Sequence, residues 1–374
     1  MSGLHLHILG GSPAANHRRL ATPERNLPPM PSYATPDLIT VGVVGYGGAF
    51  NMGKYHLEQM RQAGMTPKAV VELDPVRLEV AKLDFPGIET YGTVEAMLAA
   101  SKVQLVVIIT PHNTHAEIAL KCLAAGRHVV CEKPFAITTA ECDAMIAAAK
   151  TKGLCLSTYH NRHWDGHILK AVELLRKDAA IGEIVRIDCH MGSHGQPGDW
   201  WRSSKTISGG IMYDWGVHLL EYALQLIDGE VVEVSGTAKT GYWAPRTKWA
   251  QDTIEDEGFC LVRFKDGRWL TLTITQLDAN PRPGFVTITG TQGSYVMDFG
   301  DYTLIQPQAD GTKRTTKGRN PDGQQHLYYQ NVADHLVKDT PLVITAEWAR
   351  RPIHILDLAD RSARSGTAQT AQYP

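Results

Sequence analysis

The sequence predicts an α/β protein in two parts: a parallel sheet with helices on both faces, then an α+β region with a mainly antiparallel, open sheet. Between Leu38 and about residue 160, short β-branched runs alternate with segments of helical period, which is typical of parallel sheets. After residue 160, consecutive strand-like runs are separated by glycine turns, as in antiparallel hairpins. The length of 374 residues suits two domains better than one core.

Five strands are predicted in the first part, and the helices between them begin at recognisable caps. Asp74 before Pro75 combines an N-cap acid with proline at the first helical position. Thr138 and Glu141 have the spacing of a capping box. The predicted strands are Ile39–Val44, Lys68–Glu72, Val103–Ile109, His128–Cys131 and Leu154–Tyr159.

The second part is predicted to mix helices with a run of hairpin-connected strands. Helices are expected over His163–Arg176, Gly210–Ile227, His326–Val337 and Ala346–Ala363, with Pro352 interrupting the last. If helices cover one face of this sheet, the other face is free to pair, which predicts a homodimer or homotetramer. The predicted strands are Glu183–Met191, Val231–Thr240, Glu257–Phe264, Trp269–Leu277, Phe285–Thr289 and Ser294–Phe299.

These patterns divide the chain into three segments. Residues 1–37 contain six prolines and no apolar signal segment, so we expect an arm that is either mobile or extended on a neighbouring surface. Residues 38–160 are the predicted dinucleotide-type α/β domain. Residues 161–374 are the predicted substrate and oligomerisation domain.

Composition excludes several partner classes. Lys and Arg total 37 against 39 Asp and Glu, a net charge of −2, so nothing global favours nucleic acid or anionic lipid. The longest strongly apolar stretch, Val103–Thr110, is far shorter than the roughly 20 residues of a membrane helix. The six cysteines are scattered without a C-x-x-C pair, which predicts a reducing, cytoplasmic setting without disulfides.

A glycine-rich turn directly follows the first predicted strand. Gly45, Gly47, Gly48, Ala49 and Phe50 are the expected contacts of a dinucleotide pyrophosphate, as in a Rossmann domain. Phe50 stands at the third fingerprint position, where a small residue is usual, so the motif is incomplete. A tight turn without a ligand remains the alternative.

An acid at the end of the second predicted strand supports the dinucleotide interpretation. Glu72 lies 27 residues after Gly45, where a carboxylate can bind the adenosine ribose hydroxyls and repel a 2′-phosphate. The nearest arginine is Arg77. The sequence therefore favours NAD over NADP.

The run Glu132-Lys133-Pro134 after the fourth of these strands resembles the Gfo/Idh/MocA oxidoreductases, named for glucose–fructose oxidoreductase, inositol dehydrogenase and a rhizopine-catabolism protein. Further motifs of the family match in order over residues 38–366: Thr110-Pro111 through His115, Asn161-Arg162, Trp201-Arg202, Ser208-Gly209-Gly210 and Asp214-x-x-x-His218. The sequence departs from the family pattern in three places: the enlarged glycine loop, His163 in place of a second arginine, and the doubled Trp200-Trp201.

The resemblance implies roles for these residues. Lys133 would be catalytic, at the carboxyl end of a parallel strand where ligands bind. Asp214 and His218, four residues apart on a predicted helix, would share a face, with Asp214 orienting the substrate and His218 as general base. Whether Lys133 or His218 takes the proton stays open. Thr110, Pro111, His115, Glu132 and Lys133 would complete the cofactor site.

The remaining motif residues suit a carbohydrate. Asn161, Arg162, Trp201 and Arg202 would bind substrate together with Asp214 and His218, because flat rings cover sugar C–H faces while polar groups hold hydroxyls. His160, His163 and His167 have spacings that suggest a metal, but no cysteine or carboxylate cluster completes a ligand set, so no metal is expected.

The sequence thus predicts an NAD-dependent dehydrogenase that oxidises a secondary hydroxyl of a sugar, inositol or glycoside. Two alternatives stay open. An NAD-using glycosidase would oxidise its sugar transiently, eliminate, hydrate and then return the hydride with the same residues. A non-catalytic NAD-binding regulator would need none of the chemistry, which the presence of Lys133, Asp214 and His218 disfavours.

Overall fold

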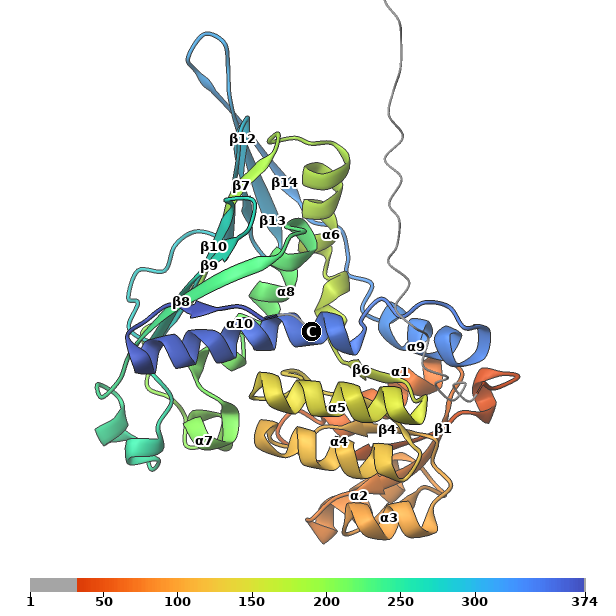
Figure 1. The fold of residues 1–374 in the computed structure, drawn as a ribbon. Coiled ribbons are helices and arrows are strands. Elements are labelled where there is room, and N and C mark those ends of the chain that lie inside the picture. The colour runs from red at the N-terminus through yellow and green to blue at the C-terminus, as the bar shows by residue number, and fades with distance from the viewer. Residues whose placement is uncertain (1–31, 373–374) are drawn as a thin grey trace, which may run out of the picture.

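A computed structural model describes residues 32–372 and contains two sheets side by side (Figure 1). The first sheet has the strand order β3-β2-β1-β4-β5-β6, and every neighbouring pair is parallel. The edge strand β3 has three residues and was not predicted, because such a run is too short to show a pattern. The strands are β1 (Thr40–Val44), β2 (Thr66–Val71), β3 (Glu89–Tyr91), β4 (Leu105–Ile108), β5 (His128–Cys131) and β6 (Leu156–Thr158).

Helices cover both faces of the first sheet, as the apolar runs predicted. Val106 and Ile108 of β4 face a core shared with α4 and α5, whereas Leu105 and Val107 face a second core shared with α1. The predicted caps are present: the Asp74 carboxylate accepts from Val76 N, and Thr138 and Glu141 form the capping box. The helices are α1 (Met52–Gln62), α2 (Pro75–Asp84), α3 (Val94–Ala100), α4 (His115–Ala124) and α5 (Thr139–Lys152).

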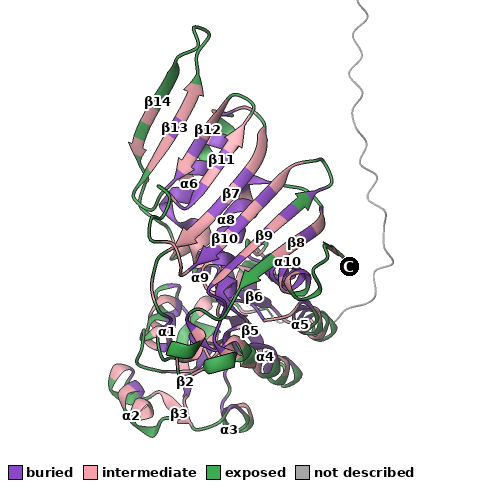
Figure 2. Cartoon of the chain, turned by 90° about the vertical axis from the view of Figure 1, so that its left-hand side faces the viewer, coloured by how far each residue is buried: buried purple, intermediate pink, exposed green. Residues whose placement is uncertain are grey.

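The second sheet has nine strands in the order β14-β13-β12-β11-β7-β10-β9-β8-β15. Only β7 and β10 are parallel; the other neighbours are antiparallel. Figure 2 shows one face of this sheet without helices. The strands are β7 (Ile184–Gly192), β8 (Val231–Lys239), β9 (Glu257–Phe264), β10 (Trp269–Thr275), β11 (Val286–Gly290), β12 (Gly293–Met297), β13 (Asp301–Pro307), β14 (Lys313–Arg319) and β15 (Gln369–Thr370).

Three helix predictions need correction. The segment predicted as one helix over 163–176 is a 3₁₀ turn (Asn161–Trp164), α6 (Gly166–Val172) and a π-helical turn (Glu173–Lys177). The helix predicted from Gly210 begins as α8 at Gly216, after a 3₁₀ turn. Pro352 does not interrupt the last helix, because α10 runs unbroken over Ala346–Ser365. The short helix α7 covers Lys205–Ser208.

The last two helices both pack against the first half of the molecule, and α10 also contacts the second sheet. Helix α9 (Leu327–Lys338) packs Tyr328 and Tyr329 into the core of the first sheet, and α10 contacts both α5 and β8. Helix α9 follows the second sheet in the chain but packs on the first sheet. The domain boundary at residue 160 therefore stays a prediction. The predicted arm over 1–37 lies outside the described residues except for its end, where Tyr33 N donates to Leu336 O.

No helix within residues 32–372 combines the length and the apolar character that crossing a membrane requires. The six cysteines are all buried and free.

Several histidines are buried inside the fold, and four of them are neutral because their pKa lies far below the ordinary value. Burial is the largest cause in each case and lowers the pKa of His128, His160, His167 and His354 to about 4. In β5, His128 Nδ1 accepts a hydrogen bond from Cys155 N at 3.0 Å, which requires the unprotonated nitrogen.

These histidines predict acid sensitivity. Below pH 6.5 these histidines bind protons in the unfolded chain but stay unprotonated in the folded chain. The free energy of unfolding should therefore fall as pH drops from 6.5 towards 4, by up to about 1.4 kcal/mol per pH unit for each histidine. Urea unfolding at pH 7.5, 6.5, 5.5 and 5.0 measures this. A free energy of unfolding that stays constant down to pH 5.0 would contradict the assignment of these groups as buried and neutral.

Candidate active site

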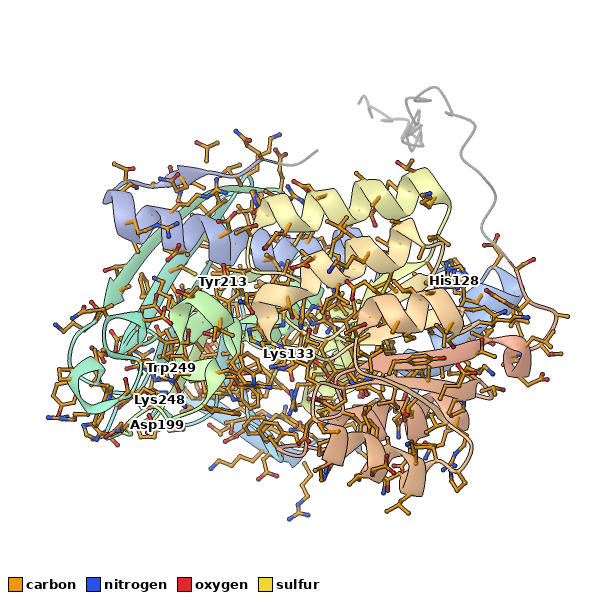
Figure 3. The ribbon with its side chains drawn as sticks, turned by 90° about the horizontal axis from the view of Figure 1, so that it is seen from below. His128, Lys133, Asp199, Tyr213, Lys248 and Trp249 are labelled. Carbon is orange, nitrogen blue, oxygen red and sulfur yellow. The ribbon has the colours of Figure 1, made fainter. Side chains whose placement is uncertain are left out.

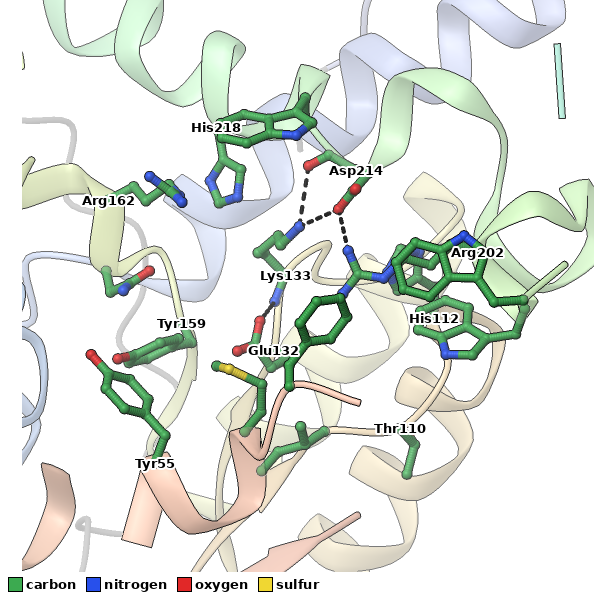
Figure 4. A pocket seen from close by; sticks show the side chains of 17 residues that line it. Tyr55, Thr110, His112, Glu132, Lys133, Tyr159, Arg162, Arg202, Asp214 and His218 are labelled. Atoms are coloured by element: carbon green, nitrogen blue, oxygen red, sulfur yellow. Dashed lines mark hydrogen bonds and ion pairs between the residues drawn. The ribbon is translucent and has the colours of Figure 1, made fainter. Parts of the chain in front are cut away.

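A cavity of about 550 Å³ lies where the carboxyl ends of β4 and β5 meet elements of the second half (Figure 4). In the view from below, Lys133 lies between the two halves of the molecule (Figure 3). Segments from the glycine loop to α8 contribute to the lining. Ten of the predicted site residues line this cavity: Phe50, Thr110, Glu132, Lys133, Asn161, Arg162, Trp201, Arg202, Asp214 and His218.

The glycine loop has the shape that a pyrophosphate needs. Gly45 has φ 105°, and a Cβ there would lie 2.8 Å from Ile109 O, whereas a Cβ on Gly47 would meet nothing within 4 Å. Gly53 fulfils the role of the missing third small residue, because a Cβ at Gly53 would lie 2.6 Å from Gly45 O. Helix α1 therefore packs closely on the loop, and no side chain caps its N-terminus. A dinucleotide fits these residues.

Glu72 organises the same loop. Its Oε2 accepts from Tyr46 N at 2.6 Å, and Oε1 accepts from the backbone N–H groups of Leu73 and Asp74. A carboxylate has about four acceptor positions, so about one stays available to a ribose hydroxyl. Arg77 lies beside the loop, with Nε donating to Tyr46 O at 2.9 Å.

Lys133 and Asp214 form the central contact of the cavity, although 81 residues separate them. Lys133 Nζ donates to Asp214 Oδ1 at 2.6 Å and to its backbone O at 3.2 Å. Arg202 Nη1 donates to the same Oδ1 at 2.6 Å. Burial opposes ionisation of Asp214, but Lys133 and then Arg202 outweigh it and hold the pKa of its carboxyl below the usual value. The group is thus an aspartate held by two cations.

Glu132 fixes the backbone of Lys133 by a hydrogen bond. Its Oε2 accepts from Lys133 N at 2.9 Å, and its Oε1 lies 2.9 Å from His56 Nε2. His56 Nδ1 in turn lies 2.5 Å from the Tyr329 hydroxyl of α9. Against the burial of Glu132, His56 and Lys133 lower the pKa of its carboxyl. The segment that carries Lys133 is therefore fixed through a buried chain that ends in α9.

His218 lies near Lys133 but does not share a helix with Asp214. Asp214 precedes α8, and His218 is in its first turn, so the prediction of one shared helix face was wrong. Figure 4 nevertheless shows both side chains at the same cavity. Burial above all, then the Lys133 and Arg162 charges, puts the pKa of His218 well below its ordinary value. Its imidazole is neutral and can accept a proton at neutral pH.

Aromatic rings surround the Arg202 guanidinium. Its carbon lies 5.4 Å from the Phe50 ring centre, 5.1 Å from Trp200 and 5.2 Å from Trp201. Phe50 comes from the glycine loop, so this cluster joins the loop to the second half. Across the cavity, Arg162 pairs with Asp165 at 3.0 Å and covers one face of Trp215.

The other predicted site residues do not line the cavity. His115 is fully buried, and its two ring nitrogens lie 2.9 Å from Pro134 O and Thr110 O, so it ties together the loops after β4 and β5. Pro111 directly precedes a 3₁₀ turn over His112–Thr114. The remaining predicted residues are Gly45, Gly47, Gly48 and Ala49 of the glycine loop, and Glu72, which follows β2 and accepts a hydrogen bond from the loop at Tyr46 N.

Sequence reasoning missed several lining residues. His112 and Trp215 are direct neighbours of residues that were given a role, so adjacency was their only signal. Trp200 was noted in the doubled Trp200-Trp201, but it was given no place in the predicted site. Tyr55 on α1 and Tyr159 after β6 had no such signal. Within residues 32–372, no group of three or more His, Cys, Asp or Glu side chains could hold a metal, and His163 of the suspected cluster bonds Glu221.

Comparisons with known sequences identify both halves. The family described as "Oxidoreductase family, NAD-binding Rossmann fold" matches residues 39–160, and the "GFO/IDH/MocA C-terminal domain" matches residues 168–296. An uncharacterised oxidoreductase of Schizosaccharomyces pombe is 35% identical, with 59% of each chain covered.

Two further relatives match over almost their full length. An uncharacterised oxidoreductase of Escherichia coli is 31% identical, covering 88% of this chain and 97% of its own. The NADP-dependent scyllo-inositol 2-dehydrogenase of Bacillus subtilis is 26% identical, covering 88% and 94%.

Solved structures share the fold. A levoglucosan dehydrogenase in complex with NADH and levoglucosan superposes with a TM-score of 0.75 at 21% identity, covering 90% of this chain and all of that one. An NAD-binding protein from Listeria innocua has a TM-score of 0.74 at 26% identity, covering 89% and 96%. The chain therefore belongs to the Gfo/Idh/MocA family of oxidoreductases, with an NAD(P)-binding Rossmann domain.

Proposed function

We propose that the protein is an NAD-dependent dehydrogenase that oxidises a secondary hydroxyl of a sugar, inositol or glycoside. One observation carries the proposal: an ammonium, a carboxylate and a neutral imidazole (Lys133, Asp214 and His218) meet in one cavity beside a glycine loop shaped for a dinucleotide. The inositol and levoglucosan dehydrogenases among the relatives support the same substrate class.

In the proposed oxidation of an alcohol, each of the three cavity residues has a different role. A bound nicotinamide supplies the hydride acceptor. His218, neutral and buried, accepts the hydroxyl proton as general base. Lys133 donates a hydrogen bond to the same oxygen and stabilises the negative charge that grows on it. Asp214 holds Lys133 in place and accepts a hydrogen bond from a neighbouring hydroxyl of the substrate.

Further residues would bind the parts of the substrate and of the cofactor that do not react. Asn161, Arg162, Trp201 and Arg202 line the substrate side, where rings and polar groups alternate as a polyhydroxylated ring requires. On the cofactor side, the backbone of Gly47 and Gly48 and the N-terminus of α1 would hold the pyrophosphate. Glu72 would bind the adenosine ribose and disfavour a 2′-phosphate, so we propose NAD over NADP. The helix-free face of the second sheet would carry the homodimer or homotetramer contact.

The proposal is tested by following NADH absorbance with a panel of hexoses, inositols and glycosides. Net NADH formation with a member of the panel is expected. Release of free sugar from a glycoside without added NAD and without net NADH would instead favour the hydrolytic alternative. An absence of both reactions with every compound would overturn the dehydrogenase proposal.

Replacing Lys133 tests its role. Lys133→Ala should lower kcat by about 10²-fold or more, as loss of a donor to a developing oxyanion does, while NADH still binds because the glycine loop is unchanged. Stopped-flow hydride transfer and NADH fluorescence measure the two effects. Lys150→Ala, an exposed lysine on α5, is the matched control and should keep full activity. Turnover within a few-fold of the parent would refute the assignment.

The pH dependence tests His218. Because its pKa is lowered, the base stays unprotonated as pH falls from 8 to 6.5, so kcat/KM should stay constant there and decline only below 6.5. The pH–rate profile, read where circular dichroism shows folded protein, checks this. An acidic limb centred at or above pH 7 would exclude the neutral imidazole as base.

Cofactor choice tests Glu72. Glu72→Gln keeps the size but removes the charge that repels a 2′-phosphate, so the ratio of kcat/KM for NADP to that for NAD should rise about tenfold. Glu79→Gln on the exposed side of α2 should leave the ratio unchanged. Equal use of NAD and NADP by the parent protein would already contradict the proposal.

A further inference from the structure

A second cavity adjoins the candidate active site, and the residues that line it alone have no part in the chemistry proposed above. It measures about 440 Å³ and shares five lining residues with the first: His112, Trp200, Arg202, Asp214 and Trp215. Small-molecule sites typically measure about 300–1,000 Å³, so it is large enough to hold a ligand group of its own. The Asp214–Arg202 pair forms part of the wall common to both cavities.

The floor of the second cavity comes from the second sheet. Gly192 ends β7 and Thr275 ends β10, and these two residues are partners in the parallel pair of that sheet. The carboxyl ends of parallel strands are where α/β sheets commonly bind ligands. The cavity thus lies at the end of the parallel strands of the second sheet, as the first cavity does for the first sheet.

Polar groups without protein partners line this cavity. Gln276 Oε1 is buried and has no hydrogen-bond partner among the described residues, although its backbone is held by Asp256 O and by Trp243 Nε1. Arg202 Nε is likewise buried and unpartnered. His112 Nδ1 bonds Ser208 O at 2.8 Å, so its other nitrogen is left as an acceptor. A buried acceptor without a donor is costly, and a ligand hydroxyl would satisfy it.

The charge of the cavity selects a neutral ligand. Its ionisable lining residues are Arg202, Asp214 and His112. Arg202 pairs with Asp214 at 2.6 Å, and Lys133, the second cation on that carboxylate, lines only the first cavity. Burial holds the pKa of His112 well below its ordinary value. No unpaired cation is therefore present among these lining residues for a phosphate or a carboxylate, whereas Trp200 and Trp215 provide flat faces for a sugar ring.

We propose that the second cavity is a subsite for a second neutral sugar ring, so that the substrate is a glycoside of at least two rings rather than a free monosaccharide. The inference rests on the proposed dehydrogenase function. The ring to be oxidised lies in the first cavity, beside Lys133 and His218. The linked ring passes the Asp214–Arg202 pair and donates a hydroxyl to Gln276 Oε1.

Steady-state NADH formation with paired probes tests the subsite. D-glucose and D-galactose are each compared with the disaccharide that carries them at its non-reducing end, cellobiose and lactose, and with glucose 6-phosphate as a charged probe. At least one disaccharide should have a kcat/KM about tenfold or more above that of its free hexose. Free hexoses, or glucose 6-phosphate, used as well as the disaccharides would overturn the subsite and leave the dehydrogenase proposal standing. No reaction with these probes, while an inositol or another member of the broader panel reacts, would overturn the subsite alone. No reaction with the whole panel, with either NAD or NADP, would overturn both proposals.

Two variants test whether the preference for a disaccharide arises in the second cavity. Gln276→Ala should lower kcat/KM for the preferred disaccharide about fivefold, the equivalent of one hydrogen bond, and change that for the free hexose less than twofold. Ser193→Trp, at the exposed rim of the cavity, should block the disaccharide without touching the first cavity, and it keeps the test valid if Gln276→Ala is unstable. Gln308→Ala, an exposed glutamine in the β13–β14 turn, is the control. Equal losses for one-ring and two-ring substrates would refute the subsite.

Discussion

The contact between Lys133 and Asp214 is the constraint on which the site depends. A lysine just after a strand of the first sheet and a carboxylate ahead of α8 meet at 2.6 Å, and neither half of the molecule contains the candidate site without the other. Two cations on one carboxylate oxygen keep that group ionised in a largely enclosed place. The adjoining imidazole is kept neutral by burial and by the same cations. One small cluster therefore holds a proton acceptor and a hydrogen-bond donor at the same pH.

The cluster is held from several directions. Behind Lys133, Glu132, His56 and Tyr329 form a buried chain that ends in α9, so a helix near the C-terminus supports a residue of the first sheet. In front, Arg202 connects Asp214 to rings on both sides of the cavity. Such networks are rigid when their members are satisfied. The geometry of the candidate site is thereby fixed by contacts that come from both halves of the molecule.

The enlarged glycine loop shows how a departure from a motif can be compensated. The loop keeps its close approach to α1 because Gly53, not the residue at the third fingerprint position, packs against Gly45. Phe50 is then free to extend from the loop and contact Trp200, with ring centres 5.6 Å apart. The position that looked like a defect in the motif thus provides a contact between the glycine loop and the second half of the molecule.

Interactions between residues close together in the chain made many elements and motifs of this protein predictable from its sequence. Strand periodicity, the caps at Asp74 and Thr138, and the glycine turn are encoded within a few residues, and so are the motifs around Lys133 and His218 that identify the family. Contacts between distant segments were not encoded locally. The parallel pairing of β7 with β10, the packing of α9 on the first sheet and the second cavity all join residues far apart in the chain. Burial also overrode local preference, because packing keeps α10 unbroken across Pro352 and turns the chain before α8, which leaves Asp214 outside the helix that carries His218.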